Sequence, residues 1–319
     1  MPRPPKLTSD QKNKLSSYEK ELRRSVKNRD LKKAKKYTVE IQRLLRKTGH
    51  ETRLMQSKNW YFECELEVGN YNTAISGFEG VRNKVNKRTR VYLEATALLA
   101  ICYLRKKDID KAEPLIHDAL NSKAIVGRER RKEFINLLTD RFEEEGALAT
   151  LIDYDYQPLN KDEIHDAVGE LVRTRSEYDL EKSIGRAIPD ETIDFIIKIH
   201  ELSKKQLPAH EIKFLPPQYL REEKEKLGKK ILNAFNRSLW SSLCDSENSV
   251  RKTLVDKTLA LPLTPIYVTS TVVASMTSLR IGIYPLAVAI TAYIIRLGID
   301  TFCEVTEPHS ILSKRNRPN

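Results

Sequence analysis

The residues of this chain best suited to catalysis are two acids and a lysine in its second half. Pro189-Asp190 is followed by Glu211-Ile212-Lys213, an order that could hold a divalent metal for phosphodiester hydrolysis. That chemistry requires the two carboxylates to lie side by side on neighbouring strands. Here Pro189 favours the start of a helix, and Glu211 stands in a proline-flanked segment. The spacing therefore argues against a nuclease centre.

A second arrangement pairs Arg43 with His50. Its R-x6-H spacing resembles that of HEPN-type ribonucleases, which are helical enzymes that bring two such motifs together. However, an expected helix ends at Gly49, and arginine is frequent enough here for the spacing to arise by chance. His117 is interpreted as a packed helical histidine. No GxGxxG, P-loop, HExxH or GxSxG pattern occurs in the sequence. We therefore expect no enzymatic activity, no catalytic residue and no cofactor.

The cysteines give no sign of a metal site. They are far apart and form no CxxC pair, and the 6 histidines are equally scattered; the cysteines are Cys64, Cys102, Cys244 and Cys303. This pattern predicts four reduced, buried thiols in a cytosolic setting. The start of the chain, MPRPPKLTSDQKNK, lacks the apolar run of a secretory signal. A cytoplasmic location is expected.

Composition and periodicity predict an all-α protein. The chain has only 11 glycines, and 31% of its residues are charged, as expected for helices with solvated faces. An apolar stripe at helical spacing ends near Asn28-Arg29-Asp30, and a second one continues to Gly49. Two further hairpins are expected at 57–85 and 92–120, followed by a capping helix at 128–152. One hairpin cannot bury both of its faces, so we expect at least three to stack.

Residues 15–125 resemble tetratricopeptide repeats. Three alanines, Ala34, Ala74 and Ala112, stand at equivalent places and lie 40 and 38 residues apart, whereas the usual period is about 34. Phe62 and Ala100 take the place of the family's glycine in the first helix of the repeat, and the closing proline is absent. The resemblance implies a concave groove lined by the first helix of each hairpin. We expect a protein partner to bind in that groove, at Tyr61, Glu65 and Tyr103.

The positive charge is concentrated at the start of the chain. Residues 1–50 contain 16 lysines and arginines against 5 acids, a balance of +11 out of +12 for the whole chain. This concentration suits an acidic or nucleic-acid partner at close range. The alternative is a solvated face that serves only solubility. The residues expected to form the basic patch are Arg23, Arg24, Lys27, Lys32, Lys33, Lys35 and Lys36.

The segment DYDYQPLN, residues 153–160, is expected to separate two domains, 1–152 and 153–319. Asn160 with Glu163 predicts a capping box for a helix that reaches about Ile184. Pro189 starts another helix, residues 207–217 form a proline-rich connector, and a long helix follows.

The second domain ends in an apolar helical hairpin, residues 258–299. Arg280 separates two uncharged runs, 258–279 and 281–295, and Arg296 follows the second. One alternative is a hairpin buried in the domain core. The other is a two-helix membrane insert with the basic residues 314–317 on the cytoplasmic side. The two alternatives differ in the exposure of Val272, Val273, Ile290 and Ile294, and in where Arg280 and Arg296 lie.

The apolar tail also resembles a C-terminal module of uncharacterised bacterial proteins, some of them from anti-phage conflict systems. The leading expectation is a non-enzymatic protein-binding scaffold, a subunit of a bacterial defence complex. Two alternatives stay open. One is a membrane-acting effector, associated with the inner membrane, whose apolar hairpin inserts into or perforates that membrane. The other is a nucleic-acid-binding subunit that uses the basic first hairpin.

Overall fold

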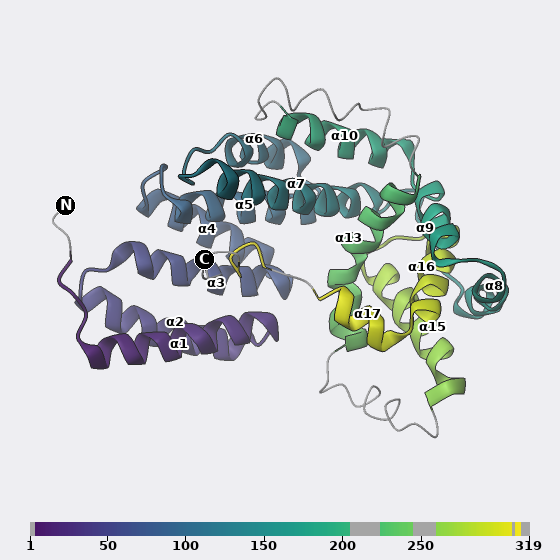
Figure 1. The fold of residues 1–319 in the computed structure, drawn as a ribbon, viewed down its shortest axis with the longest axis horizontal. Coiled ribbons are helices and arrows are strands. Elements are labelled where there is room, and N and C mark those ends of the chain that lie inside the picture. The colour runs from purple at the N-terminus through teal and green to yellow at the C-terminus, as the bar shows by residue number, and fades with distance from the viewer. Residues whose placement is uncertain (1–3, 205–223, 245–259, 308–309, 314–319) are drawn as a thin grey trace. The chain divides into compact units, whose positions relative to one another are not determined.

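The computed structural model describes residues 4–204, 224–244, 260–307 and 310–313, and all regular structure in these ranges is helical (Figure 1). The prediction of an all-α protein is therefore confirmed. The chain forms two compact units, one of residues 1–138 with the segment from Ile311 onward, the other of residues 139–310. The connector at 207–217, Glu211 and the basic residues 314–317 lie outside the described ranges.

The division between the units falls within helix α7 (Arg128–Leu151), not in the 153–160 segment where the sequence suggested it. The reason is that the last turns of α7 belong to the core of the second unit. Ala147 and Leu151 are buried in one cluster with Ile164 and Leu180. A boundary set by polar loop composition does not detect a helix whose two halves contribute to different cores.

The first unit is a stack of three helical hairpins. They are α1 (Ser9–Lys27) with α2 (Leu31–Lys47), α3 (Glu51–Glu67) with α4 (Tyr71–Lys84), and α5 (Arg90–Arg105) with α6 (Ile109–Leu120). Helix α3 contacts both α1 and α5, so the first helices of successive hairpins lie next to one another (Figure 1). This arrangement is that of a helical repeat.

The same turn closes all three hairpins. Arg29, Gly69 and Lys107 adopt left-handed backbone conformations, with φ of 53°, 87° and 61°. The following residue donates its backbone N–H five positions back in each case: Asp30 to Ser25, Asn70 to Glu65 and Asp108 to Tyr103, at 2.8, 2.8 and 2.9 Å. These are the bonds of a Schellman motif. The turns lie 40 and 38 residues apart, the same spacing as the three alanines.

The alanines occupy one structural position. Ala34, Ala74 and Ala112 each donate a backbone N–H to the N-cap residue four positions earlier, at 2.9, 3.0 and 3.1 Å. All three are fully buried. A small residue at this point lets the second helix of the hairpin approach its neighbour closely, so the predicted register matches the packing.

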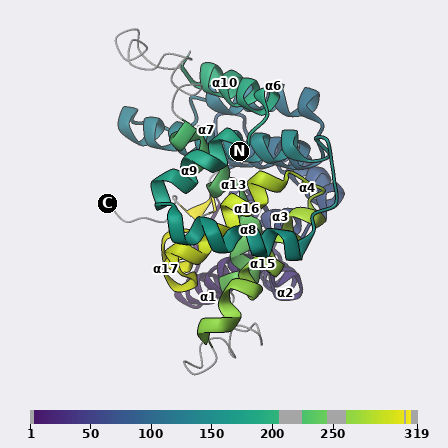
Figure 2. The ribbon, with the colours of Figure 1, turned by 90° about the vertical axis from the view of Figure 1, so that its right-hand side faces the viewer.

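The second unit is built around the remaining helices. They are the end of α7, α8 (Lys161–Thr174), α9 (Glu177–Arg186), α10 (Asp190–Lys204), α13 (Lys224–Cys244), α15 (Ala260–Ser278), α16 (Tyr284–Leu297) and α17 (Ile299–Val305). Helix α16 contacts α8, α9, α15 and α17, and Figure 2 shows it among them. Its residues from Leu286 to Ile294 are all buried, which explains why its sequence is apolar on every side.

The expected helix from Asn160 to Ile184 is instead two helices. Asn160 does cap α8, because its Oδ1 accepts the N–H of Asp162 at 3.0 Å. Helix α8 ends at Thr174, and Ser176 caps α9 in a capping box with Asp179. The sequence signal for this break is the Ser-x-x-Asp pattern itself.

Two close backbone approaches fix this unit. A Cβ on Gly228 of α13 would lie 1.9 Å from the carbonyl oxygen of Glu181 on α9, so only glycine allows the two helices to cross this closely. Gly282, in the turn between α15 and α16, lies against the backbone of Gln157 in the same way. That turn confirms the expected helical hairpin, but α16 does not run on through Gly298, where φ is 82°.

Candidate partner-binding surfaces

The residues expected to line a groove make their contacts within the repeat unit. Glu65 is buried, accepts the hydroxyl of Tyr61, and accepts Asn70 Nδ2 at 2.7 Å. It therefore ties α3 to the turn that follows it. Burial, followed by the carboxylate of Glu65, raises the pKa of Tyr61.

Tyr103 is half-buried and directs its hydroxyl to Glu79 Oε1 on α4 at 3.4 Å, while Lys111 Nζ of α6 lies 5.6 Å from its ring centre. The contacts of Tyr61 and Tyr103 thus involve different helices. Helix α5, which should form the middle of the groove, is buried along nearly its whole length, from Val91 to Leu104.

The basic residues gather at one end of the first hairpin. Because α1 and α2 are antiparallel and joined at residues 28–30, the last turns of α1 lie beside the first turns of α2. Every member of the expected patch is exposed except Arg23, which is half-buried. The exposed members are Arg24, Lys27, Lys32, Lys33, Lys35 and Lys36.

Most acids near this patch are already paired. Asp30 contacts Lys33 Nζ at 3.0 Å, and Glu19 and Glu40 pair with Arg53 and Arg43. In the part of the chain that the structure describes, no carboxylate forms an ion pair with Arg24, Lys32, Lys35 or Lys36. We call these four residues with Lys27 and Lys33 the basic face.

The apolar hairpin of the second unit lies in its core. Val272, Ile290 and Ile294 are fully buried in one cluster with Phe235 and Leu239, and Val273 packs against it. Arg280 and Arg296 are exposed, and Arg296 donates to the carbonyl of Val172 at 2.8 Å. Insertion of this hairpin into a bilayer would require the core to open.

Among the described helices, none is both long and apolar enough to cross a membrane by itself. Helices α16 and α17 meet the length and composition criteria only as a pair, and they are bent by 98°.

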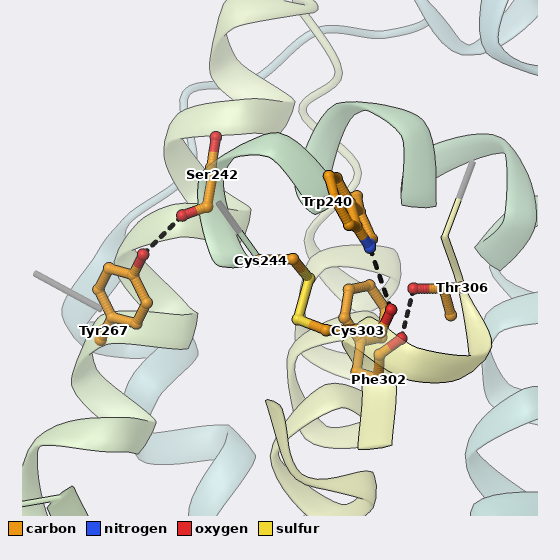
Figure 3. The surroundings of a disulfide bond; sticks show 7 residues. All are labelled: Trp240, Ser242, Cys244, Tyr267, Phe302, Cys303 and Thr306. Carbon is orange, nitrogen blue, oxygen red and sulfur yellow. Dashed lines mark hydrogen bonds between the residues drawn. A yellow bond between two sulfur atoms is a disulfide. The ribbon is translucent and has the colours of Figure 1, made fainter. Parts of the chain in front are cut away.

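The expectation of four reduced thiols is wrong for two of them. Cys244 at the end of α13 and Cys303 in α17 form a disulfide, with their Cα atoms 5.5 Å apart (Figure 3). Trp240 Nε1 donates to the carbonyl of Cys303 at 3.1 Å and packs the same junction. The two cysteines are 59 positions apart, a separation that carries no spacing signal, because folding alone brings them together. Cys64 and Cys102 take no part in a disulfide and are buried, and burial raises the pKa of Cys64 to about 12.

A buried group of charges joins α7 to α13, which the sequence did not reveal. Glu143 is buried and pairs with Lys230, while His200 Nδ1 of α10 lies 3.3 Å from Glu143 Oε1. Arg237 donates to Glu144 Oε2 at 3.0 Å. Burial nevertheless raises the pKa of Glu144 to about 7. Within the described ranges no three His, Cys, Asp or Glu side chains gather as a metal site would require. These charges lie in ion pairs that hold helices together.

The first unit also contains a shallow cleft of about 280 Å³ between the α4–α5 loop and the end of α6. Lys87, Arg88 and Lys123 lie at its edges, and Asp118 is the acid among its lining residues.

Comparison with known proteins adds no family: no family model, curated protein or solved structure matches the chain.

Proposed function

We propose that this protein is a non-enzymatic scaffold whose repeat unit, similar to tetratricopeptide repeats, binds an acidic segment of a protein partner through the basic face. The observation that carries the proposal is the place of Lys32 and Lys33. Both lie in the first turn of α2, where the acid at hand is the N-cap residue Asp30, which pairs with Lys33. The N-terminus of a helix carries partial positive charge, so lysines there disfavour the helix by about 0.3–1 kcal/mol each at low salt.

Solubility does not require this placement, because lysines further along α2 would serve it without opposing the helix dipole. A ligand with negative charge would gain from both the lysines and the N-terminal turn. Because Lys33 is compensated by Asp30, Lys32 is the residue whose charge opposes the helix dipole, and we infer that its position serves recognition.

A protein partner is favoured over nucleic acid by the aromatic residues nearby. Proteins that bind single strands offer aromatic rings on which bases stack. The ring of Tyr37 lies 5.7 Å from Lys36 Nζ, and Tyr37 and Tyr18 are half-buried and pack against each other with centroids 6.3 Å apart. They serve the contact between α1 and α2.

The repeat turns support the scaffold interpretation. Each of the three hairpins has the same type of turn and a buried alanine at the same position. Such stacked hairpins form an extended, rigid surface, which is how helical repeats present binding residues. Burial raises the pKa of Cys64, which is buried, and of Glu144, which pairs with Arg237, and neither side chain lines the cleft of the first unit. This supports a binding function over a catalytic one.

The test uses a fluorescein-labelled peptide of ten residues rich in Asp and Glu, with fluorescence anisotropy as the readout. Replacement of Arg24, Lys32, Lys35 and Lys36 by Gln should weaken binding by at least tenfold, and higher salt should weaken binding to the unaltered protein. The same variant loses Lys32, which opposes the dipole of α2, and Arg24, which favours the dipole of α1, so its urea midpoint should stay close to that of the unaltered protein.

A matched control variant removes four exposed cations of the second unit, Lys161, Arg173, Arg175 and Arg186. It changes net charge equally and should bind the peptide as before. If both variants lost the same peptide affinity, net charge alone would explain the binding. Tighter binding of a labelled DNA duplex than of the acidic peptide, lost in the same variant, would favour a nucleic-acid partner instead.

A further inference from the structure

A second cleft, of about 370 Å³, lies wholly in the second unit. Three segments that are distant in sequence line it: residues 154–157, the corner between α9 and α10, and the start of α16. The lining residues are Tyr154, Asp155, Gln157, Ala187, Ile188, Pro189, Gly282, Ile283, Tyr284 and Pro285.

The walls of this cleft are held in place by several contacts. The N–H of Asp153 donates to the carbonyl of Arg280 at 2.8 Å, and the two side chains form an ion pair. The Arg280 guanidinium also lies 5.2 Å from the ring centre of Tyr156. Close contact between Gly282 and Gln157 joins the same two segments. The cleft is therefore formed before any ligand arrives, as binding sites usually are.

The surface of the cleft combines exposed aromatic rings with prolines. Tyr154 is 39% exposed and Tyr284 is 40% exposed, on two different walls. Pro189 and Pro285 add flat apolar surface, and Ile188 is buried beneath. The Tyr284 hydroxyl donates to the carbonyl of Glu163 at 3.3 Å, which fixes the orientation of its ring.

The edge of the cleft is acidic. Asp155 lines it, and Asp190 and Glu191 begin α10 directly after Pro189. The carboxylate of Glu191 is the main cause of a raised pKa at Tyr154, with smaller effects from burial and from Asp155 and Asp190, so these charges act at the cleft itself. The charge of Arg280, which contacts Tyr156 beside one wall, is compensated by Asp153.

We propose that this cleft binds an extended, proline-containing segment of a partner protein that carries arginine or lysine beside the prolines. Proline-rich segments form a polyproline II helix without internal hydrogen bonds, and aromatic-lined grooves recognise that preformed shape. Tyr154 and Tyr284 provide the rings, and Gln157 offers an amide that can donate to the exposed peptide carbonyls. Asp155, Asp190 and Glu191 complement the basic residues of the segment.

This inference is independent of the proposed function. It concerns the other unit and a partner of the opposite charge, so one proposal can fail while the other stands.

The test measures fluorescence anisotropy of the full chain with a set of labelled decapeptides. Each contains two or three prolines and two arginines, and the spacing between them varies across the set. At least one should bind with a dissociation constant below about 1 mM, and replacing its prolines with alanine, or its arginines with glutamate, should abolish binding.

Tyr154→Ala and Tyr284→Ala should each weaken binding of that peptide about tenfold. Asp155→Asn together with Glu191→Gln should weaken it about threefold at low salt and much less at high salt. Tyr178→Ala is the matched control, because Tyr178 is 49% exposed on α9 and does not line the cleft. Melting temperatures of all variants report whether each one folds.

The proposal is overturned if no peptide of the set binds up to 1 mM, or if the glutamate peptides bind as well as the arginine peptides. It is also overturned if folded Tyr154→Ala and Tyr284→Ala proteins bind as tightly as the unaltered chain.

Discussion

The ring of Phe62 on α3 occupies the space that a Cβ on Gly77 of α4 would fill. Three ring carbons lie 2.3–2.4 Å from that position, well inside van der Waals contact. Gly77, on the opposite helix of the hairpin, leaves the space that the large ring of Phe62 fills. The ring also packs edge-on against Phe78, with centroids 5.9 Å apart.

Gly77→Ala should therefore destabilise the protein by about 1–3 kcal/mol, because the new methyl group forces Phe62 from its place. Gly80→Ala, in the same helix but with open space around it, should stabilise by about 0.5–1 kcal/mol. Urea unfolding of both variants measures the difference. Adding Phe62→Leu to Gly77→Ala should recover part of the loss, and strictly additive effects would contradict the contact.

Ala112→Arg should destabilise the first unit by several kcal/mol. Ala112 is fully buried at the repeat position shared with Ala34 and Ala74, and a buried, unpaired guanidinium is costly. Thermal unfolding followed by circular dichroism gives the measurement, with Lys111→Arg at the exposed neighbouring position as the control. An unchanged melting temperature for Ala112→Arg would contradict the repeat register.

The stability of the second unit should depend on Glu144 between about pH 4.5 and pH 7. Burial raises the pKa of this carboxyl from 4.5 to about 7 in the folded state, so the folded state holds its proton where the unfolded state has lost it. Stability from this group is present below pH 4.5 and is lost as the pH rises to 7, by up to about 3 kcal/mol.

Glu144→Gln should remove this dependence, so its free energy of unfolding should fall less than that of the unaltered protein between pH 5 and pH 7. Urea titrations at several pH values provide the data. Parallel curves for the two proteins would show that Glu144 keeps an ordinary pKa beside Arg237.

Reduction of the Cys244–Cys303 bond should destabilise the second unit by roughly 4 kcal/mol, since the bond closes a long loop in the unfolded chain. The Cys244→Ser/Cys303→Ser variant should match the reduced protein and should not respond to dithiothreitol. Urea midpoints with and without the reductant test both statements. A midpoint of the unaltered protein that does not move would mean that the two cysteines are not joined.

The repeat could be predicted because its signals are local. Apolar spacing and the three alanines identify the hairpins without knowledge of distant residues. The turns were harder to predict from the sequence. Arg29 and Lys107 adopt left-handed conformations that favour glycine, and glycine stands at this position only in the second hairpin, as Gly69.

The features that escaped prediction depend on long-range contacts. Cys244 and Cys303 meet only after α13 and α17 pack together, and the Glu143–Lys230 pair joins residues 87 positions apart. The cleft between Tyr154 and Tyr284 combines three segments that have no common pattern. Buried hairpins and membrane hairpins also share one composition, so only the surroundings of Val272 and Ile290 distinguish them.

The distribution of the cysteines gives the first unit its own chemical reporter. Cys64 and Cys102 are buried in the first unit and form no disulfide, and the two cysteines of the second unit are linked to each other. A thiol-specific reagent added to the oxidised protein can then react only when the first unit opens. The rate at which the reagent labels the protein would therefore report the transient opening of the repeat unit, and no engineered probe is needed.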